Sequence, residues 1–140
     1  MIELRTLGPV EVTVDGAQAP RELLWRKNLA LLLYLFHSPD RRRSREHLVG
    51  VFWGDKPDSS ARHSLNEALR VIRKAAGDGV ITSVGDQLEL STAEIRADTE
   101  ALEARIDAED WKGAADLVNG TFLEGFVLSG SFEFEDWLAA

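Results

Sequence analysis

The chain has 140 residues, 44% of them hydrophobic, and a formal net charge of −8. A chain of this length can bury one good core or two small ones. Because it contains no cysteine, its composition excludes a disulfide framework, a zinc-thiolate site and a cysteine nucleophile.

The sequence carries no recognisable targeting signal. The N-terminus lacks a basic run followed by an apolar core, and the longest apolar run, residues 29–36, is far too short to span a bilayer. We therefore expect a cytoplasmic protein with no membrane partner.

Two strands are predicted at the start of the chain, at residues 2–7 and 10–14. Both are alternating and rich in β-branched residues, and Gly8-Pro9 separates them. A turn signal, Asp15-Gly16, follows. This pattern predicts antiparallel strands of a small sheet.

Two helices are expected next. Residues 25–37 are apolar nearly all round, which predicts a buried helix, and the segment 38–40 ends it. After a short strand at residues 41–43, Ser44 is the predicted N-cap of a second helix that ends near residue 53. Trp25 and Trp53, at the start of the first helix and the end of the second, are predicted to be core residues.

A third helix is predicted at residues 59–76, after a turn in which Pro57 stops the preceding helix. Asp58 or Ser59 is its expected cap. One face is apolar and is expected to pack on the core; it consists of Ala61, Leu65, Ala68, Leu69, Ile72 and Ala76.

The other face of this helix is basic and polar. His63, Asn66, Arg70 and Arg73 recur at helical spacing, flanked by Arg62 and Lys74. Arg and Asn can make paired hydrogen bonds to guanine and adenine edges, and Lys and Arg neutralise phosphates. This face is therefore a candidate DNA-reading surface, and the alternative is an ordinary solvated helix side.

Residues 80–84 and 87–90 flank Gly85-Asp86, which predicts a β-hairpin. Strands, three helices and a hairpin in this order indicate an α+β winged helix-turn-helix, in which the third helix enters the major groove and the hairpin is the wing. We assign residues 1–92 to this DNA-binding domain.

Residues 93–140 are assigned to a second, helical domain. Residues 98–108 and 111–118 read as two helices packed through Leu102, Ile106, Trp111, Ala115 and Leu117, the start of a TPR-like repeat array. Residues 132–138 begin a further amphipathic helix without a C-terminal cap, so we expect a truncated domain with an exposed apolar patch there that includes Trp137.

Charge is segregated along the chain. Residues 1–19 carry −2, residues 20–76 hold twelve Lys or Arg against six Asp or Glu, for +6, and residues 77–140 hold three against fifteen, for −12. A basic module followed by an acidic one favours nucleic-acid binding by the first.

Catalysis is not expected. His37, His47 and His63 are scattered without carboxylates at metal-ligand spacing, and each is predicted to be a packed or surface residue. No Gly-rich phosphate loop, nucleophile elbow or calcium-loop pattern occurs. We therefore expect no enzyme activity, no metal site and no cofactor.

The sequence resembles the SARP class of bacterial transcriptional activators, whose winged helix is similar to the OmpR/PhoB output domain and precedes a bacterial transcriptional activation domain. The resemblance spans essentially the whole chain, and its most specific part is the Trp53-Gly54-Asp55 turn with Pro57, together with the downstream helix end at residues 73–77. The other matching stretches lie within residues 4–12, 60–65, 72–77, 114–126 and 132–138.

The resemblance implies sequence-specific DNA binding at a promoter by side-by-side protomers, with recruitment of RNA polymerase. It places the base-reading residues on the helix at residues 59–76. It also implies phosphate contacts from Arg42, Arg43 and Arg45, to which we add Ser59 and Ser60 at the helix N-terminus and the flanking Arg62 and Lys74.

Two features depart from this family pattern. The hairpin at residues 81–90 has no Lys or Arg and carries Asp86 and Glu89, and the reading helix carries Glu67. The alternative function is therefore a protein-interaction module on a winged-helix scaffold that has lost or weakened DNA binding.

Overall fold

The computed structural model describes residues 1–126, 128 and 131–139. The chain forms two compact units, Met1–Ala19 with Thr92–Phe126 and Pro20–Ser91 with Val127–Ala140. Each unit therefore combines two segments that are far apart in sequence. The predicted domain boundary at residues 92 and 93 lies next to one junction between units, but the units themselves cross it. Taken together, the described residues form a mixed α and β structure.

The first unit contains a four-stranded sheet with the order β3-β2-β1-β7. Its strands are β1 (Ile2–Arg5), β2 (Glu11–Val14), β3 (Ala17–Gln18) and β7 (Ile95–Ala97). The predicted antiparallel pair β1 and β2 is confirmed. Asp15 and Gly16 turn the chain into β3 with φ angles of 52° and 82°, the positive values that a type I′ hairpin turn requires.

Strand β7 was not expected from the sequence. It pairs with β1 in parallel, with Ile2 opposite Ile95, and both side chains are fully buried. Asp98, directly after β7, accepts hydrogen bonds from the backbone N–H groups of Thr6 and Leu7, each at 2.9 Å. The second half of the chain thus completes the sheet that the first residues begin.

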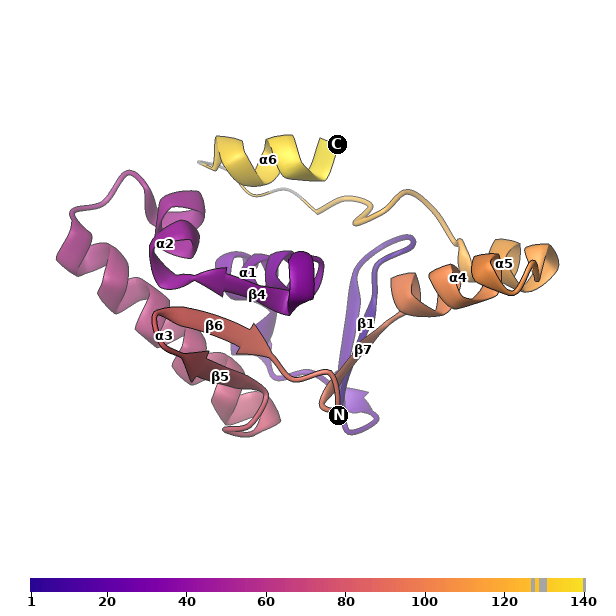
Figure 1. Cartoon of the computed structure of the whole chain (residues 1–140), viewed down its shortest axis with the longest axis horizontal. Helices are drawn as coiled ribbons and strands as arrows, with labels where there is room; N and C mark the ends of the chain where they lie inside the picture. The colour runs from indigo at the N-terminus through magenta and orange to yellow at the C-terminus, as the bar shows by residue number, and fades with distance from the viewer. Residues whose placement is uncertain (127, 129–130, 140) are drawn as a thin grey trace. The chain divides into compact units, whose positions relative to one another are not determined.

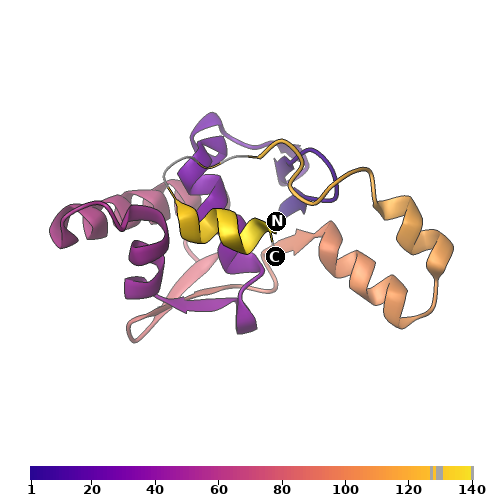
Figure 2. The ribbon, with the colours of Figure 1, turned by 90° about the horizontal axis from the view of Figure 1, so that it is seen from above.

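Helices α4 (Asp98–Asp107) and α5 (Trp111–Leu117) follow β7 as an antiparallel pair (Figure 2). Both helices were predicted. The predicted packing role is wrong for Ile106 and Trp111, which are 43% and 62% exposed, whereas Leu102 and Leu117 are half-buried. Ala114 is the buried residue of α5.

The second unit begins with a 3-10 turn, η1 (Arg21–Leu24), and helix α1 (Arg26–Phe36). Every residue from Leu29 to Phe36 is buried, as predicted for a central helix. Trp25 is 56% exposed, so its predicted core position is wrong, whereas Trp53 at 4% exposure confirms its own. Trp25 lies in the short link between η1 and α1 rather than inside a helix, so its ring has no helical face to join.

A second short turn, η2 (Pro39–Arg41), leads into strand β4 (Arg42–Ser44) and helix α2 (Arg45–Trp53). The predicted N-cap is confirmed, because the Ser44 hydroxyl accepts a hydrogen bond from the His47 N–H at 3.0 Å. Helix α3 (Asp58–Ala76) has Pro57 at its N-cap position and no side-chain cap. The predicted cap at Asp58 or Ser59 is wrong, since the helix already includes both residues.

The predicted hairpin is confirmed as strands β5 (Ile81–Val84) and β6 (Gln87–Leu90). Strand β4 pairs with β6, which gives a three-stranded sheet in the order β4-β6-β5. Figure 1 shows this sheet beside α3, with α1 and α2 contacting the same helix. The hairpin is therefore anchored to the helical part of the unit along β4.

Helix α6 (Phe132–Ala139) contacts α2 within the second unit. Phe134 is fully buried, with its ring centroid 5.7 Å from that of Phe52. The Trp137 ring lies 5.2 Å from Tyr34, and the Ser131 hydroxyl donates to the Val51 carbonyl at 2.6 Å. The expected exposed apolar patch at residues 132–138 is therefore wrong for the side chains described, because earlier helices of the chain supply the packing partner.

The described residues contain no helix that is both long and apolar enough to cross a membrane.

Candidate nucleic-acid interface

Helix α3 presents two faces, as its sequence predicts. The core face is buried and includes Ala61, Leu65, Ala68, Leu69 and Ile72. The opposite face is exposed to solvent and includes Arg62, His63, Asn66, Arg70 and Lys74. An uninterrupted helix of 19 residues thus carries the candidate reading surface.

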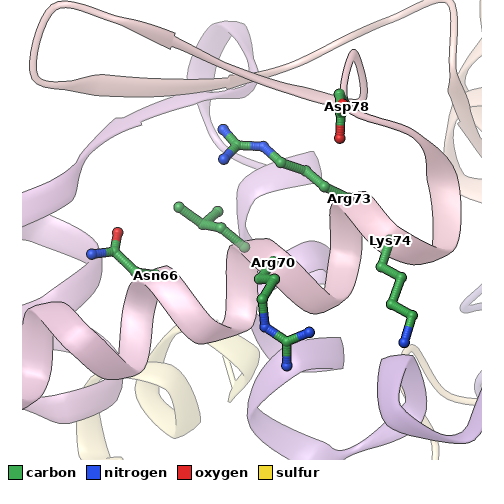
Figure 3. Close-up of a pocket in the computed structure, with 6 residues that line it drawn as sticks. Asn66, Arg70, Arg73, Lys74 and Asp78 are labelled. Carbon is green, nitrogen blue, oxygen red and sulfur yellow. The ribbon is translucent and has the colours of Figure 1, made fainter.

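The second half of this face borders a shallow hollow of about 510 Å³. Its lining residues are Asn66, Leu69, Arg70, Arg73, Lys74 and Asp78. Figure 3 shows Arg73 extending toward the hairpin side of α3, whereas Arg70 and Lys74 extend to the other side. The hollow therefore combines three cations, one amide and one carboxylate on an open surface.

Arg73 is held by the fold. Its Nε and Nη2 donate to the Ile81 carbonyl at 3.2 and 3.1 Å, and its side chain is half-buried. Both donors are thereby used to fix strand β5 to helix α3. In this arrangement, the predicted base-reading arginine connects the helix to the hairpin.

Arg70 is exposed and pairs with Glu67 one turn earlier on the same helix, at 3.1 Å. An ion pair this accessible contributes at most about 1 kcal/mol, because water and salt screen it. A phosphate or a guanine edge can therefore replace the carboxylate at small cost. The pair also keeps the guanidinium close to the helix surface.

Arg45, the first residue of α2, joins α3 to the hairpin. Its Nη1 donates to Asn66 Oδ1 at 3.1 Å, and its Nη2 donates to Ser83 Oγ at 3.1 Å. The sequence predicts neither contact. Ser83 was missed because its position beside Arg45 depends on the pairing of β4 with β6, which no local pattern encodes.

The other predicted phosphate ligands are exposed, with the exception of Arg43. Arg42 is exposed and pairs with Glu89, its cross-strand neighbour, at 3.1 Å. Arg43 is half-buried, donates to Ser38 Oγ at 3.1 Å and lies 5.4 Å above the Tyr34 ring. The remaining members, Ser59, Ser60, Arg62 and Lys74, are all exposed along α3.

The histidines are packed or surface residues, as predicted. His47 Nε2 lies 2.7 Å from the Tyr34 hydroxyl, and His37 Nδ1 lies 2.8 Å from the Leu33 carbonyl, whereas His63 is exposed. Burial, with the nearby positive charge of Arg43, lowers the pKa of His47. Burial raises the pKa of Tyr34. No group of His, Asp or Glu in the described part of the chain is arranged to hold a metal ion.

No family model and no curated protein matches the sequence. A solved structure of Mycobacterium tuberculosis EmbR in complex with a low affinity phosphopeptide does match, with a TM-score of 0.70 at 19% identity. The fold is similar to that of EmbR. The match covers 99% of this chain and 41% of the EmbR chain. The chain therefore spans less than half the length of EmbR, and at this identity the likeness establishes the fold alone.

Proposed function

We propose that this chain is a sequence-specific DNA-binding transcriptional regulator. In this proposal the second unit is a winged helix, α3 enters the major groove, and the β5-β6 hairpin is the wing. The observation that carries it is the exposed basic face of α3, with Asn66 and Arg70 one helical turn apart beside an open hollow. The sequence resemblance to the SARP class supports the same function, and the fold is similar to that of EmbR.

Within this proposal the two kinds of contact come from different residues. Asn66 and Arg70 read base edges, with His63 beside them on the same exposed face. Arg73 orients the wing through its bonds to Ile81. Phosphates are held along α3 by Ser59, Ser60, Arg62 and Lys74, and by Arg42 from β4, while Arg43 supports the packing of α1.

The family resemblance favours an activator that acts in the cytoplasm. On this basis α4 and α5 begin a TPR-like bacterial transcriptional activation domain, protomers assemble side by side on repeated sites, and RNA polymerase is the protein partner. The chain is then a regulator without enzyme activity or cofactor.

A protein-interaction module is the second candidate function. The second unit holds twelve Lys or Arg against twelve Asp or Glu, and the first unit holds four against twelve, so the basic segment is neutralised within its own unit. The hairpin also lacks Lys and Arg. Both features weaken the attraction of phosphates, which supplies much of the affinity for DNA.

A selection experiment separates the two functions. The chain is incubated with a pool of random duplex DNA at two salt concentrations, and the retained DNA is sequenced. A regulator enriches a repeated motif and loses affinity steeply with salt. Asn66→Ala/Arg70→Ala should abolish the enrichment, whereas Arg5→Ala, an exposed arginine on β1, should not. Absence of retention at low salt would favour the protein-interaction module.

A further inference from the structure

The Arg45 side chain links helix α2 to helix α3 and to strand β5. Arg45 starts α2, Asn66 lies in the middle of α3, and Ser83 lies on β5. One guanidinium bonds both partners, each at 3.1 Å. A residue expected to bind phosphate is thus directed at the amide expected to read a base.

The chemistry of the two groups fixes the amide orientation. A guanidinium donates hydrogen bonds and accepts none, so it can hold only the oxygen end of an Asn side chain. Arg45 bonds Asn66 Oδ1. The Asn66 Nδ2 group is therefore turned away from Arg45, and this amide orientation is favoured in the free protein.

The Arg45 residue is held both at its backbone and at its guanidinium. The Arg45 backbone N–H donates to the Asp86 carbonyl at 2.9 Å, and the preceding residue, Ser44, caps α2. Ser83 Oγ accepts from the far end of the side chain. Because α2 and the hairpin both anchor it, Arg45 can impose a direction on Asn66, which is exposed and otherwise free to rotate.

We propose that Arg45 is a positioning residue that sets which base Asn66 reads, in place of the phosphate contact expected from the sequence. This inference rests on the proposed DNA-binding function. With Oδ1 turned toward Arg45, Asn66 offers Nδ2 as a donor to an acceptor on the base edge. When the duplex binds, it excludes water from this surface, and the lower local dielectric strengthens the Arg45–Asn66 hydrogen bond.

The test compares base preferences of wild type, Arg45→Met, Asn66→Ala and the double variant. We expect Arg45→Met to reduce preference about tenfold at the base pair that Asn66→Ala also affects, because tenfold corresponds to about 1.4 kcal/mol, the size of a single well-formed hydrogen bond. The double variant should lose no more than Asn66→Ala alone. The salt dependence of binding should stay unchanged.

Two further variants distinguish a positioning role of Arg45 from a loss of charge or of structure. Arg45→Lys keeps the charge and loses the two-pronged donor, so it should keep the salt dependence and still lose the base preference. Arg62→Met, at an exposed arginine of α3, should weaken all sequences alike and lower the salt slope by about one. The same uniform behaviour in Arg45→Met would overturn the inference and leave the proposed function intact.

A measurement without DNA tests the bond itself. The side-chain amide resonances of Asn66 should shift in Arg45→Met, and less so in Ser83→Ala, which removes only the outer support of the guanidinium. Unchanged resonances in Arg45→Met would refute the Arg45–Asn66 bond. Absence of DNA binding by the wild type would overturn the proposed function, and with it the role assigned to Arg45.

Discussion

Arginine side chains of the second unit serve two purposes that residue type alone does not distinguish. Arg43 and Arg73 are half-buried and bond Ser38 and the Ile81 carbonyl, whereas Arg62 and Arg70 face solvent. The difference comes from the packing of the hairpin and α1 around them. A basic stretch in sequence therefore overestimates the number of cations available to a ligand.

Arg70→Ala should weaken specific binding by about 1–3 kcal/mol and relax base preference, if Arg70 makes a paired contact to guanine. Arg70→Lys is the matched control, because it keeps the charge and loses the paired donors. Binding to selected and random duplexes measures both effects. Equal losses on the two kinds of duplex would contradict a base-reading role.

Arg42→Ala should weaken binding to all sequences alike and reduce the salt slope by about one. Glu89→Gln should instead strengthen binding to all sequences, because it removes the carboxylate that pairs with Arg42 in the free protein. Titrations over a range of salt concentrations give the slopes. An Arg42→Ala slope equal to that of the wild type would show that Arg42 does not meet a phosphate.

His47 should make stability depend on pH. Burial first, and then the charge of Arg43, lowers its pKa below the ordinary 6.5, while Glu133 acts in the opposite direction. The folded state therefore favours the neutral ring. The stabilisation is present above about pH 6.5 and is lost as the pH falls through the lowered pKa.

Denaturant unfolding between about pH 7 and pH 5 measures this dependence. His47→Gln should flatten the decline in unfolding free energy on the acid side. His63→Gln is the control, because the His63 side chain is exposed in the folded chain. A decline of the same size in His47→Gln would assign the pH dependence to other groups.

Local patterns predicted most elements. Alternation and Gly-containing turns identified β1, β2 and the β5-β6 hairpin, and apolar periodicity identified α1, α3, α4, α5 and α6. Strand β7 was missed because it has three residues and is defined by parallel pairing with β1. A strand formed by a partner more than ninety residues away in sequence leaves little local signal.

Local patterns also predicted one helix start correctly, at Ser44, and placed the start of α3 wrongly. Ser44→Ala should destabilise the chain by about 1 kcal/mol, because it removes the cap bond to the His47 N–H. Ser59→Ala should change stability little, since α3 has no side-chain cap. Denaturant unfolding of both variants is the measurement. A larger loss in Ser59→Ala would contradict the observed start of α3.

At the scale of the whole molecule, the C-terminal helix belongs to the unit of the early helices. Phe134→Ala should lower the unfolding free energy by about 3–5 kcal/mol, because its fully buried ring packs on Phe52. Trp25→Ala, at an aromatic of the same unit that is 56% exposed, should cost less than about 1 kcal/mol. Equal unfolding free energies of the two variants would show that α6 does not pack on the core.

Charge is also redistributed by folding. The +6 of residues 20–76 joins Asp78, the two acids of the hairpin and the three of α6 in one unit, whose Lys and Arg then equal its Asp and Glu in number. The surplus of −8 lies entirely in the first unit. Any attraction for DNA therefore depends on the local face of α3, and a salt titration will report that face rather than net charge.

The sequence by itself determined the order of elements, the two faces of α3 and the cap at Ser44, because each depends on residues within one or two turns of chain. Only the tertiary structure decided that β7 completes the first sheet, that α6 packs on α2, and that Arg45 holds Asn66. These contacts join residues from distant segments, so their energy comes from burial and hydrogen bonds that no local window contains.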